Sequence, residues 1–402
     1  MFPVLPSIHR ALRDLTAAVT VAAVLGATAA TGSAGAANDR ATEVDSVRAV
    51  AERGPDALLD GRLNRLEEAL FDDAADGRLD DHTLLSAALI ACGVEDAEEL
   101  RHWQSERAKW LALFRESNGA KPARGVAPGS AGASPSLDKQ LAASLFAFMH
   151  ERVLDGGYHL SATDLRDTLA QGRFNCVSSS VLYQSLGQEL GLKLVGLEVP
   201  GHALARLYPS EGEPINVETT CPSWFRLKDK PVDRQDRLRD RVGAVADTDR
   251  STAREVSPLD QAAMIYYNRG VALLAENRFL EAAVANAKAL HLDPRNEIAH
   301  GNLLATLNNW SIALGQAGRF ADAATILEAG MSLDPDYETF ALNYIHVHHQ
   351  WVRQLASEGR FDEALARLRK ATRTLPDQPY LRQTQAEIER QRATEKNRFQ
   401  GA

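Results

Sequence analysis

Apolar residues recur every three or four positions along most of the chain, and in one region they alternate with polar residues. The first pattern occupies residues 42–117, 137–153 and 262–399 and predicts amphipathic helices. The alternating pattern begins at residue 193, where KLVGLEV, HALARLY and INVETT predict three short antiparallel strands. A helix packed on a small sheet, followed by an all-helical segment, predicts an α+β fold class.

The C-terminal helical pattern repeats with a period of 41 residues. The same residues return at turns, at small positions and at helix ends: Asn277, Gly318 and Gly359; Ala282, Ala323 and Ala364; Pro294, Pro335 and Pro376. Two helices that meet at the alanine resemble the tetratricopeptide repeat, whose usual period is about 34 residues. We place the additional residues in the first helix of each pair. Residues 262–399 are interpreted as three units and a capping helix, whose groove either binds a protein partner or packs on the preceding domain.

Two segments of different composition separate the patterned regions. Residues 118–136 are rich in Gly, Ala, Pro and Ser and are interpreted as a linker. That linker either separates an N-terminal helical region, residues 42–117, from the rest or forms a surface loop inside one helical assembly. Residues 227–261 are densely charged and are interpreted as a second linker.

The N-terminus has the pattern of a secretory signal. Residues 1–37 contain Arg10 and Arg13, an uncharged alanine-rich run, and an Ala34-Gly35-Ala36 cleavage pattern. We expect export to the bacterial periplasm or the extracellular space. The alternative is an uncleaved signal that anchors the chain in a membrane.

Composition excludes several function classes. The 402 residues carry a net charge of −9, so a nucleic-acid partner is not expected. Three cysteines are too few for a disulfide framework or a zinc site, and Cys92 lies in an apolar run typical of a buried residue. The histidine-rich segment 346–349 lacks carboxylates at ligand spacing. We therefore expect no metal and no cofactor.

Residues 174–220 contain the groups of a nucleophilic site. Cys176 begins an apolar helical pattern, where unpaired amides and the helix dipole favour an anion. His202 follows a Pro-Gly turn, and Asn216 and Glu218 lie on the third predicted strand. A thiol, an imidazole and a carboxylate or amide are the parts of a cysteine triad. A disulfide between Cys176 and Cys221 is the alternative for this thiol.

The motif FNCVSSSVLYQSLGQELGL, with GLEVPGH and INVETT after it, resembles the transglutaminase-like cysteine-peptidase superfamily. The resemblance covers residues 137–226 and is strongest to the bacterial SirB-like branch, which joins such a domain to tetratricopeptide repeats. It implies a papain/transglutaminase-like core with Cys176 as nucleophile and His202 as general base. It assigns Glu218 to the acid position, where the superfamily usually has aspartate, and leaves Asn216 as the rival third member.

The predicted function is that of an exported thiol-dependent hydrolase or acyltransferase. Through the triad it would cleave or transfer amide bonds of a protein or peptide substrate. The alternative is a non-catalytic adaptor, in which the transglutaminase-like fold and the repeats bind protein partners.

Overall fold

The structure, a computed structural model, describes residues 34–118, 137–199, 201–226 and 253–400. Most of the predicted signal and of the two predicted linkers lies outside these ranges. The chain forms two compact units. The sheet unit contains Leu63–Arg269 and Leu292–Arg295, and the repeat unit contains Thr28–Arg62, Gly270–His291 and Asn296–Ala402. In the described part of the chain, no helix is both long and apolar enough to cross a membrane.

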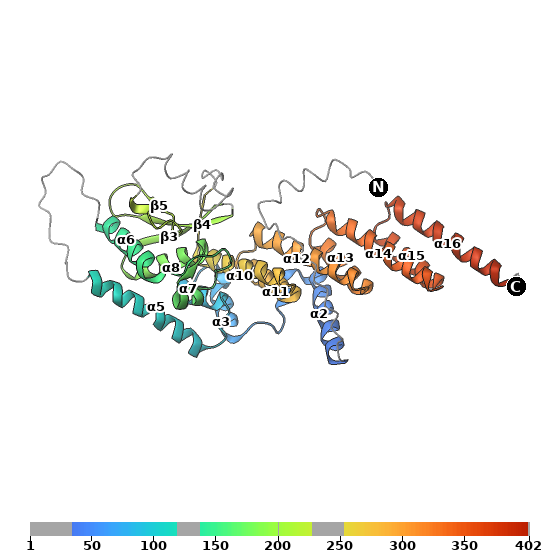
Figure 1. Cartoon of the computed structure of the whole chain (residues 1–402), viewed down its shortest axis with the longest axis horizontal. Coiled ribbons are helices and arrows are strands. Elements are labelled where there is room, and N and C mark those ends of the chain that lie inside the picture. The colour runs from blue at the N-terminus through green and yellow to red at the C-terminus, as the bar shows by residue number, and fades with distance from the viewer. Residues whose placement is uncertain (1–33, 119–136, 200, 227–252, 401–402) are drawn as a thin grey trace, which may run out of the picture. The chain divides into compact units, whose positions relative to one another are not determined.

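The sheet unit is an α+β assembly in which α8 packs on a small four-stranded sheet (Figure 1). Its helices are α3 (Arg65–Asp73), α4 (Leu84–Ala91), α5 (Ala97–Asn118), α6 (Leu137–Phe148), α7 (Leu165–Gln171), α8 (Cys176–Glu189) and the first part of α10 (Pro258–Ala275). Leu111 and Phe114 of α5 share a core with Leu145 of α6 and Leu186 of α8. The helices on both sides of residues 119–136 therefore belong to one helical assembly.

The sheet has four antiparallel strands in the order β5-β4-β3-β6. They are β3 (Lys193–Val199), β4 (His202–Tyr208), β5 (Ile215–Val217) and β6 (Arg254–Val256). The first three confirm the predicted meander. The strand β6 was missed, because its polar sequence has no alternating pattern. Backbone pairing with β3 and an ion pair of 2.7 Å between Arg254 and Glu198 hold it in place.

The apolar face of β4 packs on α8, as its alternation predicts. Ala205 and Leu207 are completely buried, and both belong to the same hydrophobic core as Leu182 of α8. Gly191, with φ of 83°, follows the helix and allows the chain to reverse into β3. This packing places the first turn of α8 beside the start of β4.

The repeat unit is all-helical and confirms the predicted arrangement of helix pairs. Its described elements are α2 (Ala34–Arg53), η1 (Pro55–Leu59), α11 (Phe279–Leu292), α12 (Glu297–Gln316), α13 (Phe320–Leu333), α14 (Thr339–Ser357), α15 (Phe361–Thr374) and α16 (Pro379–Gln400). The first helices α12 and α14 have 20 and 19 residues, and the second helices α13 and α15 have 14 each. The additional residues therefore lie in the first helices. The predicted N-terminal region, 42–117, is divided between the two units.

Equivalent contacts return one repeat later. Phe279 stacks on Trp310 with ring centroids 6.2 Å apart, and Phe320 stacks on Trp351 at 6.4 Å. The turn between paired helices needs a left-handed residue. Asn277 supplies it with φ of 59° in one unit, and Gly318 supplies it with φ of 73° in the next. This explains why Asn or Gly precedes each Arg-Phe pair.

Candidate functional site

Cys176 is the first residue of α8, where the sequence places it. Asn175 precedes the helix, and its side-chain oxygen accepts hydrogen bonds from the amides of Val177 at 2.9 Å and Ser178 at 3.1 Å. The Ser178 hydroxyl accepts from the Asn175 amide at 3.0 Å, which completes a capping box. Among the described residues, no acceptor bonds the Cys176 amide. The half-buried thiol therefore lies beside a helix N-terminus with an amide available to a ligand.

The three serines after Cys176 have structural partners. Ser178 donates to the carbonyl of Ala162 at 2.8 Å, and Ser179 donates to the carbonyl of Asn175 at 2.7 Å. Ser179 and Ser180 both contact the hydroxyl of Thr219 at 2.8 Å. All three are buried. They hold the first turn of α8 against the end of the sheet, and none is placed to act as a nucleophile.

His202 and Glu218 form a buried pair at one end of the sheet. His202 begins β4, and Glu218 directly follows β5 on the neighbouring strand. Because Ala205 pairs with Val217, the register places the two side chains on the same face. The His202 Nε2 atom lies 2.7 Å from Glu218 Oε2, and the side chains are 9% and 1% exposed.

The Glu218 carboxylate is fixed by three hydrogen bonds. Its Oε1 atom accepts from the Thr220 amide at 3.0 Å and from the Thr220 hydroxyl at 2.6 Å, while Oε2 contacts His202. Burial acts to raise the pKa of Glu218, but the charge of His202 and the hydrogen bonds from His202 and Thr220 outweigh it and lower the pKa. Glu218 is therefore an ionised group in a dry environment.

The contact with Glu218 also raises the pKa of His202. Burial acts to lower this pKa, whereas the Glu218 charge and hydrogen bonds to Cys176 and Glu218 raise it, with a result of about 10. Since Glu218 occupies Nε2, the ring nitrogen left for the thiol is Nδ1. The imidazole is thus held by a buried carboxylate, and the Cys176 side chain acts on its pKa in the same direction.

Asn216, the alternative third member, is engaged elsewhere. Arg206 Nε donates to its side-chain oxygen at 2.8 Å, and Trp224 Nε1 donates to its carbonyl at 2.9 Å. The structure brings Glu218, and not Asn216, to the imidazole. Cys176 and Cys221 are both free cysteines in this structure, so the alternative disulfide between them is not present. The Cys221 sulfur lies beside the Ser223 hydroxyl.

Two tyrosines near the thiol were missed by sequence reasoning. Tyr158 pairs with Phe174 in a short parallel ladder between β1 (Gly157–Tyr158) and β2 (Arg173–Phe174). Burial, and then the charges of Cys176 and Glu218, raise the pKa of Tyr158 to about 12. On α10, Tyr267 has its pKa raised by burial and then by the charges of Glu198 and Cys176. No sequence pattern marks either tyrosine, because the pairing of β1 with β2 and the packing of α10 near α8 depend on contacts between residues far apart in the sequence.

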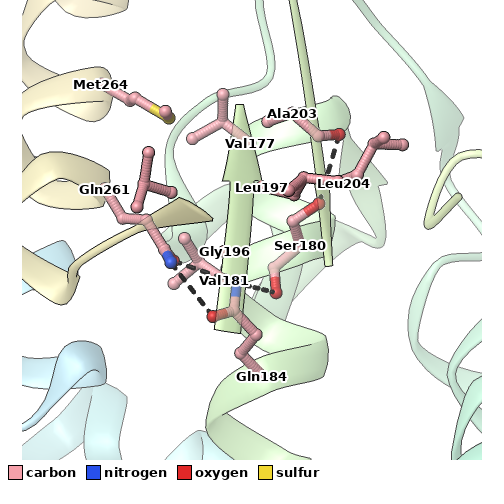
Figure 2. A pocket seen from close by; sticks show the side chains of 11 residues that line it. Val177, Ser180, Val181, Gln184, Gly196, Leu197, Ala203, Leu204, Gln261 and Met264 are labelled. Carbon is pink, nitrogen blue, oxygen red and sulfur yellow. Dashed lines mark hydrogen bonds between the residues drawn. The ribbon is translucent and has the colours of Figure 1, made fainter. Parts of the chain in front are cut away.

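A cavity beside α8 is too small to hold a substrate (Figure 2). Its volume is ≈ 10 Å³, which is room for about one water molecule. At its edge the amides of Gln184 and Gln261 exchange two hydrogen bonds, of 3.1 Å and 3.0 Å, and thereby join α8 to α10 (Figure 2). This cavity is a packing feature of the helix that carries Cys176.

Cys92 and His348 are buried outside the site. Cys92 lies at the end of α4, where its sulfur accepts a hydrogen bond from the Leu165 amide at 3.3 Å, and burial raises its pKa. This confirms the buried position that its apolar run predicts. His348 of α14 is 1% exposed, and neither ring nitrogen has a hydrogen-bond partner within the described part of the chain.

Comparison with known proteins identifies the repeats. Residues 315–388 match the tetratricopeptide repeat family. No curated protein and no solved structure matches the chain. The match begins at the end of α12 and reaches α16, so it does not include residues 137–226, and the transglutaminase-like assignment stays a prediction. The C-terminal array is consistent with tetratricopeptide repeats and suggests protein partners.

Proposed function

We propose that this chain is a thiol-dependent hydrolase or acyltransferase that acts on amide bonds of a protein or peptide substrate. Cys176 is the nucleophile, His202 the general base and Glu218 the group that orients the imidazole. The observation that carries the proposal is the buried His202–Glu218 contact of 2.7 Å, and the Cys176 side chain also acts to raise the pKa of the same ring.

The reaction proceeds through a thioester. The Cys176 proton passes to His202, and the sulfur attacks the carbonyl carbon of the substrate amide. The imidazolium then returns the proton to the nitrogen, the C–N bond breaks and the amine leaves. Water or a second amine attacks the thioester, and the acyl group departs while the thiol is restored. Atoms and charge balance without any metal or redox partner.

The start of α8 supports the oxyanion of this reaction. The Cys176 amide, together with the positive end of the helix dipole, is suited to bind the negative oxygen that forms on the attacked carbonyl. Glu218 contributes by holding the imidazolium that forms when the thiol loses its proton. A charge buried beside a counter-charge needs little reorganisation during the reaction.

The helix and sheet arrangement agrees with a transglutaminase-like core. A cysteine at a helix start, a histidine at the head of the following strand pair and an acid after the next strand occur here in the order that the resemblance implies. Export belongs to the same proposal and rests on the sequence of residues 1–37 alone.

A non-catalytic adaptor is the second candidate function. The tetratricopeptide match over residues 315–388 favours it, because such arrays present surfaces to protein partners. In that case the His202–Glu218 pair would only stabilise the sheet. The two functions differ in whether Cys176 forms an acyl bond.

Acylation by p-nitrophenyl acetate tests this difference. The activated ester acetylates the sulfur and releases p-nitrophenolate, so a competent site gives one equivalent in a burst and an acetyl group on the peptide that contains Cys176. The burst should vanish in Cys176→Ser and fall by at least about 100-fold in rate in His202→Ala. Absence of the adduct on Cys176 in the wild-type protein would favour the adaptor.

A further inference from the structure

The segment from Tyr158 to Thr163 is bound to the first turn of α8. The Asn175 side-chain amide donates to the Leu160 carbonyl at 3.1 Å and to the Thr163 hydroxyl at 2.6 Å. The His159 amide donates to the Phe174 carbonyl at 2.8 Å, which extends the ladder between β1 and β2. The segment is thus held by the same asparagine that caps the Cys176 helix.

This segment exposes two apolar side chains near the start of α8. Leu160 is 81% exposed, more than any other large apolar side chain in the described ranges, and Tyr158 is 38% exposed. The inner edge of the Tyr158 ring packs on Phe174, with centroids 6.0 Å apart. Phe174 lies two residues before Cys176, so this contact places the Tyr158 ring near the start of α8, and the charges of Cys176 and Glu218 act to raise the pKa of its hydroxyl. An apolar ligand group that covered these two side chains would remove their surface from water, which is favourable.

We propose that Tyr158 and Leu160 form an apolar subsite that receives an aliphatic or aromatic side chain of the substrate next to the bond that Cys176 attacks. The inference rests on the proposed function of Cys176 and names its substrate class: amides with an apolar residue at the reacting position. A backbone held by Asn175 pre-organises the two side chains, and therefore binding does not require ordering of a loop.

The subsite predicts a preference among alkylating reagents that share one reactive group. Iodoacetamide and N-benzyl iodoacetamide both transfer a carbon to the thiolate with loss of iodide, and they differ in the apolar group that the subsite would contact. Rates of Cys176 alkylation are read by peptide mass spectrometry. The rate for N-benzyl iodoacetamide is divided by the rate for iodoacetamide. This ratio is then normalised by dividing it by the same ratio measured for the glutathione thiol. The wild-type protein should give a value of about 10.

Two substitutions and one control assign the preference to these residues. Leu160→Ser and Tyr158→Ser should each lower the normalised ratio towards one. Leu342→Ser removes a leucine of the repeat unit that is 61% exposed, and its ratio should equal that of the wild type. Tyr158→Phe keeps the ring and should keep the ratio, which separates loss of apolar contact from loss of folding.

The outcomes distinguish the subsite from the proposed function. Rapid, His202-dependent labelling of Cys176 with a normalised ratio of one would overturn the subsite and leave the proposed function standing. Labelling no faster than that of glutathione, with a ratio that still depends on Leu160, would support the subsite and overturn the proposed function. If gel filtration shows a dimer that Leu160→Ser dissociates while the ratio is unchanged, the patch binds a second copy and the subsite is overturned.

Discussion

The Nε2 atom of His202 lies 2.7 Å from a Glu218 carboxylate oxygen that has no access to water. This contact decides what the imidazole can do. It fixes the ring orientation, stabilises the protonated ring and leaves Nδ1 for the Cys176 thiol. A protonated imidazole beside a cysteine favours the thiolate, which is the reactive form of the sulfur.

Glu218→Gln should lower the rate of Cys176 acylation by p-nitrophenyl acetate by about 100-fold. The amide has nearly the same shape as the carboxylate but no charge, so it cannot stabilise the imidazolium. Asn216→Ala is the matched control, since Asn216 contacts Arg206 in the same part of the sheet, and its rate should stay within about twofold of the wild type. A larger loss in Asn216→Ala than in Glu218→Gln would contradict the assignment of the triad.

Asn175→Ala should lower both the stability of the sheet unit and the reactivity of Cys176. The change removes the acceptor for two amides of α8 and the donor to Leu160 and Thr163, at a cost of about 2 kcal/mol in the free energy of unfolding. Hydrogen exchange of the α8 amides and alkylation of Cys176 measure the two effects.

Asn64→Ala is the control for that substitution. Asn64 forms the equivalent capping box of α3, with hydrogen bonds of 2.9 Å from the amides of Leu66 and Glu67, on a helix that carries no site residue. It should destabilise α3 by about 1 kcal/mol and leave Cys176 alkylation unchanged. Equal loss of reactivity in the two variants would mean that the α8 cap has no special role in the site.

His348 should make the repeat unit less stable in acid. Burial lowers the pKa of His348 to about 4; the charge of Glu328 opposes this, and those of Lys370 and Arg367 add to it. The folded state therefore keeps the ring neutral, while the unfolded chain takes up a proton below its ordinary value of 6.5. Stability is fully present above pH 6.5 and falls by about 1.4 kcal/mol per pH unit between 6.5 and 4.

His348→Phe tests this dependence. Phenylalanine fills a similar volume between Tyr344 and Trp351, whose rings lie 4.4 Å and 5.8 Å from the imidazole, and it does not titrate. The thermal unfolding midpoint of the variant, relative to wild type, should rise as the pH is lowered from 7 to 5. A difference between the two midpoints that is the same at both pH values would contradict the prediction.

Gly330→Ala should destabilise the repeat unit, and Gly301→Ala should stabilise it. A Cβ atom at Gly330 of α13 would lie 2.6 Å from the Phe340 ring, which is completely buried and cannot move aside without strain. The expected cost is about 2 kcal/mol. A Cβ atom at Gly301 of α12 would meet nothing within 4 Å, so the higher helix propensity of alanine should contribute about 1 kcal/mol. Thermal unfolding of both variants checks the opposite signs.

The sequence predicts those parts of the molecule that rest on local patterns. The helix that begins at Cys176, the strand that begins at His202 and the turns at Asn277 and Gly318 all follow from periodicity and from residues suited to caps or left-handed turns. The preference for Glu218 over Asn216 came from the family resemblance and not from a local pattern. Both lie on one face of the sheet, and only the register of β4 and β5 decides which one reaches the imidazole.

Features that depend on distant pairing were missed. The strand β6 has only one buried residue, Val256, and its pairing with the backbone of β3 has no signal in the local sequence. The division of residues 42–117 between the two units also has no local signal, because it depends on which distant helices each segment contacts. The subsite residues Tyr158 and Leu160 belong to the same class, since their position follows from hydrogen bonds to Asn175 and Phe174.

The pH dependence of Cys176 alkylation by iodoacetamide shows whether His202 and Glu218 activate the thiol. Wild-type protein is compared with His202→Ala and His202→Gln, and peptide mass spectrometry separates Cys176 from Cys92 and Cys221. If His202 and Glu218 activate the thiol, wild-type Cys176 reacts rapidly at pH 6, whereas both variants react only as the pH approaches about 8.5, as an ordinary thiol does. If the three profiles coincide, the imidazole does not activate the sulfur and the chain is not a cysteine hydrolase or acyltransferase.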